Sequence, residues 1–330
     1  MIKIAIDGMG GDNAPSITAQ GVTLAIQANT ALECIVYGDQ AVLKPLLGDT
    51  PRVQIVHTSD VISMDEKAAI DAMRRDKTSS LSLAMQAVVS GDAVAVVSAG
   101  PTGAMVAGAH ILIKRIKGMK RTALMPVLHT NGHVKLLLDV GANIETKPEH
   151  LVQYAIAGSL YAQHVLGVET PNVGLLNNGS ESSKGRELEQ AAYELLTNQS
   201  EVHFVGNVEA KGFYTSDVHV YVTDGYTGNA VLKAMEGTLS RFSSALKTEI
   251  KASKVSMIGA LLMKKSLKNV KKYFDVATGA ILLGVNAPVI KAHGSSTAEE
   301  FASAIQQGYD LAAGDVVGRL KAVLESEESE

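Results

Sequence analysis

The sequence has one cysteine, no tryptophan and few other aromatic residues, and neither sign of charge dominates it. The single cysteine, Cys34, excludes a disulfide within one chain, so we expect it to be buried and the protein to be cytoplasmic. A net charge of −4 gives the chain no overall attraction to nucleic acid or to lipid. The N-terminus lacks a basic segment followed by an apolar one, which disfavours a secretory signal.

Long hydrophobic runs and metal-binding motifs are also lacking. The longest stretch without Asp, Glu, Lys or Arg is 93–113, and the sequence SAGPTG interrupts it. That composition predicts a buried strand, a turn and a helix rather than a transmembrane span. The nine histidines are scattered without a His-Glu-x-x-His motif, and no Gly-x-Ser-x-Gly motif occurs. We therefore expect chemistry without a metal, a cofactor or a nucleophilic side chain.

The chain does contain a regular alternation of short apolar runs with helical segments. The runs that we expect to be strands are 2–6, 33–37, 53–57, 93–97, 173–176, 202–205 and 218–222. Because several of them are almost wholly apolar, they predict a mostly parallel sheet covered by helices on both faces. Two further strands, 122–128 and 133–139, flank the dipeptide Asn131-Gly132 and predict a β-hairpin.

The C-terminal third changes character. It predicts a helical stretch over 228–274, strands at 279–285 and 288–292, and a last helix over 298–325. With no internal repeat and no linker, residues 1–330 are expected to form one α/β domain, a three-layer α/β/α sandwich. A helical excursion with basic and apolar residues is expected within it at 237–275.

Five of the expected strand ends run into loops rich in Gly, Ser, Thr and Asn. These loops have the sequences DGMGGD (7–12), SAGPTG (98–103), NNGSESSKG (177–185), TDGYTGN (223–229) and HGSS (293–296). Glycine lets the backbone come close to a ligand, and the helix that follows supplies unpaired N–H groups. Because ligands of open α/β sheets collect at the carboxyl ends of the strands, the five loops predict one anion-binding site.

Neither common nucleotide-binding motif fits these loops. In the first loop, Asn13 stands where the dinucleotide fingerprint has its third glycine. In the third loop, Ser183 precedes Lys184 and Gly185 follows it, which is not the order of a phosphate-binding P-loop. A lysine at the start of a helix is favourable when an anion lies beside it, so Lys184 is either an anion ligand or a solvated surface lysine.

Several of the polar loop residues also have a structural interpretation. Ser296 or Thr297 would form a capping box for the last helix with the glutamate three residues later. Asp7 and Asp224, each at a strand end, would either orient other groups or cap turns. His293 is open to both a ligand role and a structural one.

From 250 to 274 the chain carries seven lysines and no acidic residue, and nine uncharged residues lie at 255–263. A short apolar segment flanked by lysines predicts interfacial binding to an anionic membrane. The alternative is a helix–helix or dimer contact with the lysines as its solvated rim. The residues expected to touch the membrane are Lys254, Val255, Met257, Ile258, Leu261, Leu262, Lys264 and Lys265.

Taken together, the five loops resemble the bacterial phosphate acyltransferase family, which transfers a fatty acyl group from acyl carrier protein to inorganic phosphate. The resemblance rests on IDGMGGDNAP (6–15), SAGPTGA (98–104), NNGSESSKG (177–185), TDGYTGN (223–229) and HGSS (293–296), in that order. It implies a fold similar to phosphotransacetylases and isocitrate-type dehydrogenases, a homodimer and no metal requirement. It also implies loose attachment to the inner face of the cell membrane, where a membrane acyltransferase uses acyl phosphate to acylate glycerol 3-phosphate for phospholipid synthesis.

Within this resemblance, phosphate near neutral pH is largely dianionic and attacks the thioester without a strong base, so the enzyme positions groups and stabilises charge. The candidate catalytic residues are Lys184, His293, Asp224 and Asn229. The candidate binding residues are Asp7, Gly8, Gly10, Gly11, Gly100, Thr102, Gly103, Asn178, Gly225, Gly228, Gly294 and Ser295. In this hypothesis Lys184 and the loop N–H groups hold phosphate, and His293 or nearby backbone donors stabilise the oxyanion. Asp224 and Asn229 orient the site.

Three alternatives stay open. A short-chain phosphate acetyl- or butyryltransferase acting on acyl-CoA would share the loops but would have no use for the lysine-rich segment. A dehydrogenase of the related fold would bind NAD(P). A non-catalytic, membrane-docked scaffold that binds acyl groups would leave the five polar loops unexplained.

Overall fold

The computed structural model describes residues 1–65, 69–130, 133–273 and 279–327, and the chain divides into two compact units. Unit 1 comprises Met1–Met125, Ile156–Glu169 and Thr278–Glu330, and unit 2 comprises Pro126–Ala155 and Thr170–Ala277. Both units are discontinuous in sequence, so segments that are far apart along the chain build one core. The single domain expected over residues 1–330 stays a prediction.

The sheet of unit 1 has the strand order β3-β2-β1-β4-β11-β10. Its strands are β1 (Ile2–Asp7), β2 (Leu32–Gly38), β3 (Val53–His57), β4 (Ala95–Ser98), β10 (Gly279–Leu283) and β11 (Val289–Ala292). Neighbouring strands are parallel except for β10 and β11, which are antiparallel. Strands β1 and β4 are buried along their apolar residues, as two-sided coverage requires. Cys34 of β2 is buried as expected, and burial raises the pKa of its thiol to about 12.

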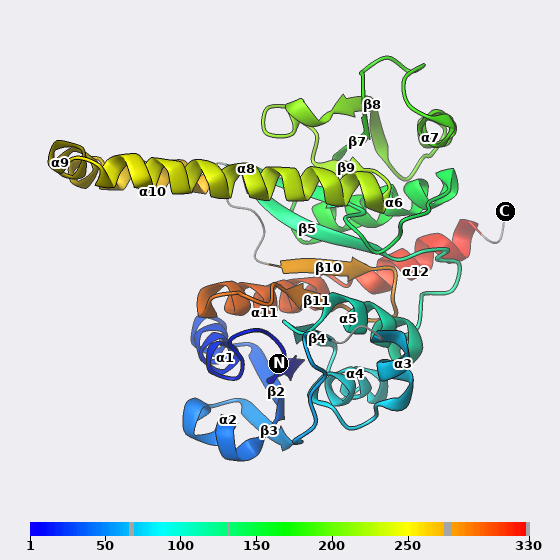
Figure 1. Ribbon diagram of the computed structural model, residues 1–330. Helices are drawn as coiled ribbons and strands as arrows, with labels where there is room; N and C mark the ends of the chain where they lie inside the picture. The colour runs from blue at the N-terminus through cyan, green and yellow to red at the C-terminus, as the bar shows by residue number, and fades with distance from the viewer. Residues whose placement is uncertain (66–68, 131–132, 274–278, 328–330) are drawn as a thin grey trace. The chain divides into compact units, whose positions relative to one another are not determined.

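Helices cover both faces of this sheet (Figure 1). They are α1 (Ser16–Ala28), α2 (Gln40–Leu47), α3 (Ala69–Arg75), α4 (Ser80–Ser90), α5 (Thr102–Gly108), the π-helix η1 (Ala109–Ile113), α11 (Ala298–Ala313) and α12 (Val316–Glu327). Helix α1 packs closely on α11, where Gly21 meets Phe301, and α4 packs with α5 and η1 on the opposite face. The expected single last helix is wrong, because the chain turns between α11 and α12 at Asp315, whose φ is 48°.

Unit 2 has the strand order β5-β6-β9-β7-β8. Its strands are β5 (Ala123–Thr130), whose first residues belong to unit 1, β6 (His133–Leu138), β7 (Asn172–Asn177), β8 (His203–Glu209) and β9 (Val220–Val222). Strands β5 and β6 are antiparallel, which confirms the hairpin, although its turn at 131–132 lies outside the described residues. The other neighbours are parallel, so the predicted mostly parallel α/β architecture is confirmed. The helices are α6 (Pro148–His164), whose residues from Ile156 onward belong to unit 1, α7 (Glu187–Thr197) and the short 3-10 helix η2 (Ala210–Gly212).

The remainder of unit 2 is an arm formed by α8 (Gly225–Lys251), α9 (Lys254–Leu262) and α10 (Lys264–Lys272). Helix α8 packs on β6 and then extends beyond the sheet of its unit, with α9 at its far end (Figure 1). The helical stretch expected over 228–274 is therefore interrupted, since Ser253 caps a new helix by accepting the N–H of Val255 (3.2 Å). Within the described residues, no helix combines the length and the apolar character that a membrane crossing requires.

Candidate functional site

Three of the five predicted loops meet at one edge of unit 1. Strands β1, β4 and β11 are parallel neighbours, so the loops that follow Asp7, Ser98 and Ala292 leave the sheet on the same side. Asp7 is buried and accepts hydrogen bonds from the N–H of Gly10 (3.1 Å) and from the hydroxyl of Ser98 (2.6 Å). The same hydroxyl accepts a hydrogen bond from the N–H of Gly100 (2.9 Å). Asp7 therefore links the first loop to the second.

The glycines of the first loop are required by the close approach of the backbones. A Cβ at Gly10 would lie 2.8 Å from the backbone nitrogen of Gly100. Gly11 has a φ of +113°, a conformation that side chains rarely adopt. The N–H of Asp12 donates to the carbonyl of Gly294 (2.8 Å), which joins the HGSS loop to the other two. The predicted residues that gather here are Asp7, Gly8, Gly10, Gly11, Gly100 and Gly294.

Lys291 lies at the same edge and is absent from the predicted site residues. Its side chain is half-buried, and its Nζ donates to the carbonyl of Ala99 (3.2 Å) and to that of Ala292. Burial lowers the pKa of Lys291 to about 8, against the opposing effect of Asp12 and Asp7. Burial also raises the pKa of Asp7, although the hydrogen bonds to its carboxylate offset part of this effect. The available sequence signal was a single charged residue in the strand VIKA, directly before the HGSS loop.

The HGSS loop uses its side chains partly for its own structure. The Oγ of Ser295 lies 2.8 Å from Nδ1 of His293, and both side chains are exposed. Thr297 and Glu300 form the capping box of α11, which confirms one of the two predicted pairs. Ser296 takes no part in that capping box, and its Oγ is buried without a hydrogen-bond partner among the described residues. A buried hydroxyl of this kind is expected to bond to water or to a ligand.

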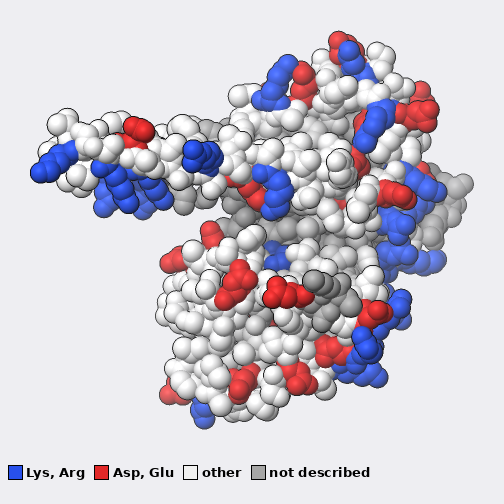
Figure 2. All heavy atoms as spheres, viewed as in Figure 1, with Lys and Arg blue, Asp and Glu red and all other residues white. Residues whose placement is uncertain are grey.

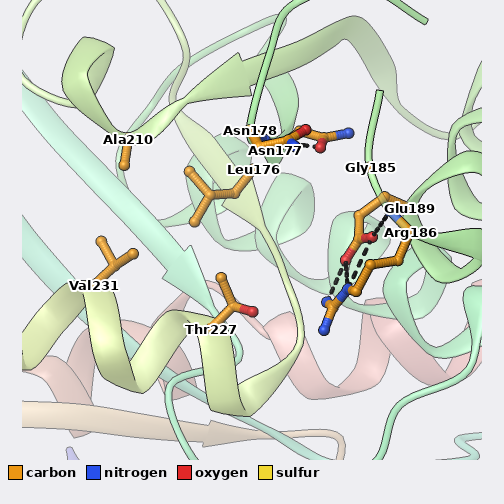
Figure 3. A pocket seen from close by; sticks show the side chains of 9 residues that line it. All are labelled: Leu176, Asn177, Asn178, Gly185, Arg186, Glu189, Ala210, Thr227 and Val231. Atoms are coloured by element: carbon orange, nitrogen blue, oxygen red, sulfur yellow. Dashed lines mark hydrogen bonds and ion pairs between the residues drawn. The ribbon is translucent and has the colours of Figure 1, made fainter. Parts of the chain in front are cut away.

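The other two predicted loops meet in unit 2, at a pocket of about 450 Å³ (Figure 3). The residues that line it are Leu176, Asn177, Asn178, Gly185, Arg186, Glu189, Ala210, Thr227 and Val231. Leu176, Ala210 and Val231 make part of the wall apolar, whereas the loop residues make the rest polar. Asn178, a predicted binding residue, belongs to the polar part and is exposed. Such a wall suits a ligand that has both a polar and an apolar portion.

Arg186, which is absent from the predicted residues, holds these two loops together. Its guanidinium forms ion pairs with Glu189, as Figure 3 shows, and with Asp224, the N-cap of α8. Asp224 accepts hydrogen bonds from the N–H of Thr227 (2.9 Å) and from its hydroxyl (2.7 Å). Burial raises the pKa of Asp224, but the hydrogen bonds from Thr227 and Arg186 outweigh it, so the pKa lies below its ordinary value. In the structure, Asp224 therefore caps a helix and forms an ion pair.

Lys184 is exposed in the loop before α7. Its N–H donates to the carbonyl of Glu181 (3.1 Å), and its carbonyl accepts from the side chain of Asn177 (3.2 Å). These two bonds fix the backbone of Lys184 while its side chain stays at the surface. Both interpretations of Lys184, as an anion ligand and as a solvated lysine, agree with this position, so its role stays a prediction.

Asp139, at the end of β6, explains the need for two of the predicted glycines. It is buried and accepts hydrogen bonds from the N–H groups of Gly141 (3.1 Å) and Asn143 (2.8 Å). A Cβ at Gly225 would lie 2.7 Å from Oδ2 of Asp139, and a Cβ at Gly228 would collide with the carbonyl of Asp139. Both glycines therefore let the start of α8 approach this strand end, which is a packing role.

The predicted residues thus fall into two groups, one in each unit. In unit 1, Thr102 and Gly103 are exposed in the first turn of α5, directly after the Gly100 turn. In unit 2, Asn229 is exposed near the start of α8. Across the described parts of the chain, no group of three or more His, Cys, Asp or Glu residues is arranged to hold a metal ion. The expectation that all five loops line one site stays a prediction.

The chain is similar to known proteins over nearly its whole length. The model of a family described as fatty acid synthesis protein matches residues 2–319. A phosphate acyltransferase of Lacticaseibacillus casei (strain BL23) is 47% identical over 302 residues, which cover 90% of this chain and 88% of that protein. A phosphate acyltransferase of Streptococcus equi subsp. zooepidemicus (strain H70) is 46% identical over 324 residues, which cover 97% and 96%. A phosphotransacetylase structure from Streptococcus pyogenes shares the fold, with a TM-score of 0.61 and 17% identity over 96% of this chain and 94% of that one.

Proposed function

Since the chain belongs to the fatty acid synthesis protein family, we propose that it is a phosphate acyltransferase acting on acyl carrier protein. It moves a long-chain fatty acyl group from the carrier's thioester to inorganic phosphate and so supplies acyl phosphate for phospholipid synthesis. The observation that carries the proposal is the identity to phosphate acyltransferases over nearly the whole chain. The three loops around Lys291 support it, because backbone N–H groups and a cation are suitable ligands for an anion.

In the proposed reaction a phosphate oxygen attacks the thioester carbonyl, the carbon–sulfur bond breaks, and the carrier leaves as a thiolate that takes up a proton. Phosphate is a sufficient nucleophile near pH 7, because its second pKa of about 6 leaves it largely dianionic. The N–H groups of the first two loops bind the phosphate, and Lys184 is kept as a candidate anion ligand. His293 or a neighbouring N–H donates to the oxyanion that forms on the carbonyl, where preorganised donors lower the barrier.

Lys291 adds a second cation to this scheme. Its pKa of about 8 leaves it largely protonated at pH 7, and it loses its charge as the pH rises through that value. Its Nζ donates to the carbonyl of Ala99, which directly precedes Gly100. Its charge therefore lies among the loops that are proposed to hold phosphate, and we include Lys291 as a phosphate ligand.

The arm is proposed to attach the protein to the inner face of the cell membrane. All eight residues predicted to touch the membrane are exposed, with Val255 at 79%, Leu261 at 70% and Leu262 at 82%. Apolar side chains at such exposure favour insertion into the membrane interface, and each nearby lysine adds about 1 kcal/mol at an anionic surface. Acyl phosphate made there would pass directly to a membrane acyltransferase that acylates glycerol 3-phosphate.

One assay tests the reaction. Purified protein is incubated with a long-chain acyl carrier protein thioester and labelled phosphate, and hydroxylamine-sensitive acyl phosphate is measured. Product from this donor supports the proposal, whereas product from acetyl-CoA alone would indicate a short-chain phosphate acyltransferase. The absence of product from both donors would overturn both assignments and favour the scaffold. The proposed homodimer is tested separately, by sedimentation equilibrium.

A further inference from the structure

A strongly basic loop of unit 1, residues 114–121, has no part in the scheme above. Its sequence is KRIKGMKR, so five of its eight residues are Lys or Arg. No acidic residue occurs between Asp92 and Asp139 on either side of it. In a chain with a net charge of −4 this is a local concentration of positive charge, and we call it the basic loop.

The fold holds the basic loop in a fixed shape. Ile116 and Met119 are buried, and the N–H of Ile116 donates to the carbonyl of Gly284 (3.0 Å). The side-chain amide of Asn286 donates to the carbonyls of Lys114 (3.2 Å) and Arg115 (3.0 Å). The apolar residues therefore anchor the loop, and all five of its cationic residues are exposed.

The same side of unit 1 carries more positive charge. Arg74 and Arg75 of α3 and the following Lys77 are exposed, and α3 packs on α5, where Met73 approaches Gly108. Figure 2 shows Lys and Arg over the part of unit 1 that bears α3, with Asp and Glu beside them. Residues 69–77 also contain Asp71 and Asp76 and so have a net charge of only +1, and the basic loop itself supplies most of the positive charge of this region.

We propose that the basic loop is the surface on which the acyl carrier protein docks, through an acidic face of that protein. This inference rests on the proposed function, which supplies the partner. A rigid patch of cations attracts an acidic partner, speeds its encounter and fixes its orientation. A lipid surface fits the loop less well, because its apolar residues Ile116 and Met119 are buried, in contrast to those of α9.

The position of the basic loop suits a carrier that presents its thioester at the end of a long flexible arm. Helix α5 has seven residues and η1 has five, and together they join the Gly100 turn to the basic loop. A helical segment of twelve residues spans about 18 Å. A protein docked on the basic loop would therefore reach the three loops of unit 1 through its prosthetic group rather than through its own surface.

The test is a charge-reversal variant, Lys114→Glu/Lys117→Glu/Arg121→Glu. A matched control, Lys44→Glu/Lys147→Glu/Arg319→Glu, makes the same change of charge at exposed positions outside the basic loop and the arm. We measure the Kd of fluorescently labelled acyl carrier protein and the steady-state kinetics with its acyl thioester. The loop variant should raise Kd and KM at least tenfold and leave kcat at saturating carrier unchanged, and the control should match the wild type. Added salt should weaken wild-type binding more than that of the loop variant.

The results separate this proposal from the proposed function. A wild-type KM in a folded loop variant, or an equal rise in the control, would overturn the docking surface. Loss of binding to anionic vesicles by the loop variant, with an unchanged Kd for the carrier, would assign the loop to lipid and also overturn it. If the wild type makes no acyl phosphate but binds the carrier in a loop-dependent way, the proposed function alone fails.

Discussion

Replacement of Asp224 should reveal how strongly a helix cap and an ion pair stabilise unit 2. Asp224→Ala removes the acceptor of two hydrogen bonds from Thr227 and one carboxylate partner of Arg186. Loss of the N-cap bond to the N–H of Thr227 costs about 1 kcal/mol, the lost partner of the Thr227 hydroxyl about 1 kcal/mol more, and the pair with an exposed guanidinium at most about 1 kcal/mol. We expect the free energy of unfolding to fall by about 3 kcal/mol, which lowers the melting temperature of a 330-residue chain by roughly 4 °C.

The variant Asp224→Asn removes the negative charge of this residue and keeps a side chain that can cap the helix. Asparagine is an equally good N-cap, so we expect a loss of only about 1 kcal/mol. The native pKa of Asp224 lies below its unfolded value of about 3.9. Its ionised form therefore stabilises the fold above about pH 4, and this stabilisation is lost as the pH falls through the native pKa.

Calorimetric unfolding at pH 7 and pH 3 measures both effects of Asp224. The stability gap between wild type and Asp224→Asn should be present at pH 7 and should narrow at pH 3. Equal melting temperatures for the Ala and Asn variants at pH 7 would refute the capping argument. A gap between wild type and Asp224→Asn that does not change with pH would refute the assignment of the depressed pKa to this residue.

Three further predictions concern activity and membrane binding. Lys184→Ala should lower kcat/KM for phosphate about 10²-fold without changing thermal unfolding, because the side chain is exposed; normal turnover would exclude Lys184 as a ligand. The wild-type KM for phosphate should rise as the pH passes through about 8, where Lys291 loses its proton. In Lys291→Met the KM for phosphate should be high at every pH and should not rise further near pH 8. A rise near pH 8 that persists in this variant would come from another group. Leu261→Glu should reduce co-sedimentation with anionic vesicles, whereas Leu195→Glu, at an exposed leucine of α7, should not. Equal sedimentation of the two variants would count against the arm as the membrane contact.

The strand ends of the site could be predicted from sequence because their signals are local. Asp7 closes an apolar run and precedes glycines, a pattern that by itself predicts a strand, a turn and a close backbone approach. Lys291 could not be placed in the same way. Its role depends on β11 lying beside β4, an order of strands set by packing across the whole of unit 1. Only that neighbourhood brings its ammonium to the carbonyl of Ala99.

The pairing of Arg186 with Asp224 shows the same limit in unit 2. The two residues are 38 positions apart, and nothing in either local sequence specifies the other as its partner. The break between α11 and α12 has a different cause. Helical periodicity continues through 298–325, while the backbone of Asp315 takes a positive φ that most side chains disfavour. A pattern of apolar residues therefore predicts the existence of a helix more reliably than it predicts the residue at which the helix ends.

The scarcity of buried residues in the arm affects how its sequence can change during evolution. The buried residues of α8 are Gly225, Gly228 and Leu232, all within its first eight residues, although the helix has 27. The rest of α8, together with α9, has no buried residue and so adds nothing to a hydrophobic core. Substitutions there are free of the packing constraints that fix the sheet and the loops. The arm can therefore diverge, or be exchanged between relatives, as a module whose sequence is adapted to its surroundings without disturbing the chemistry.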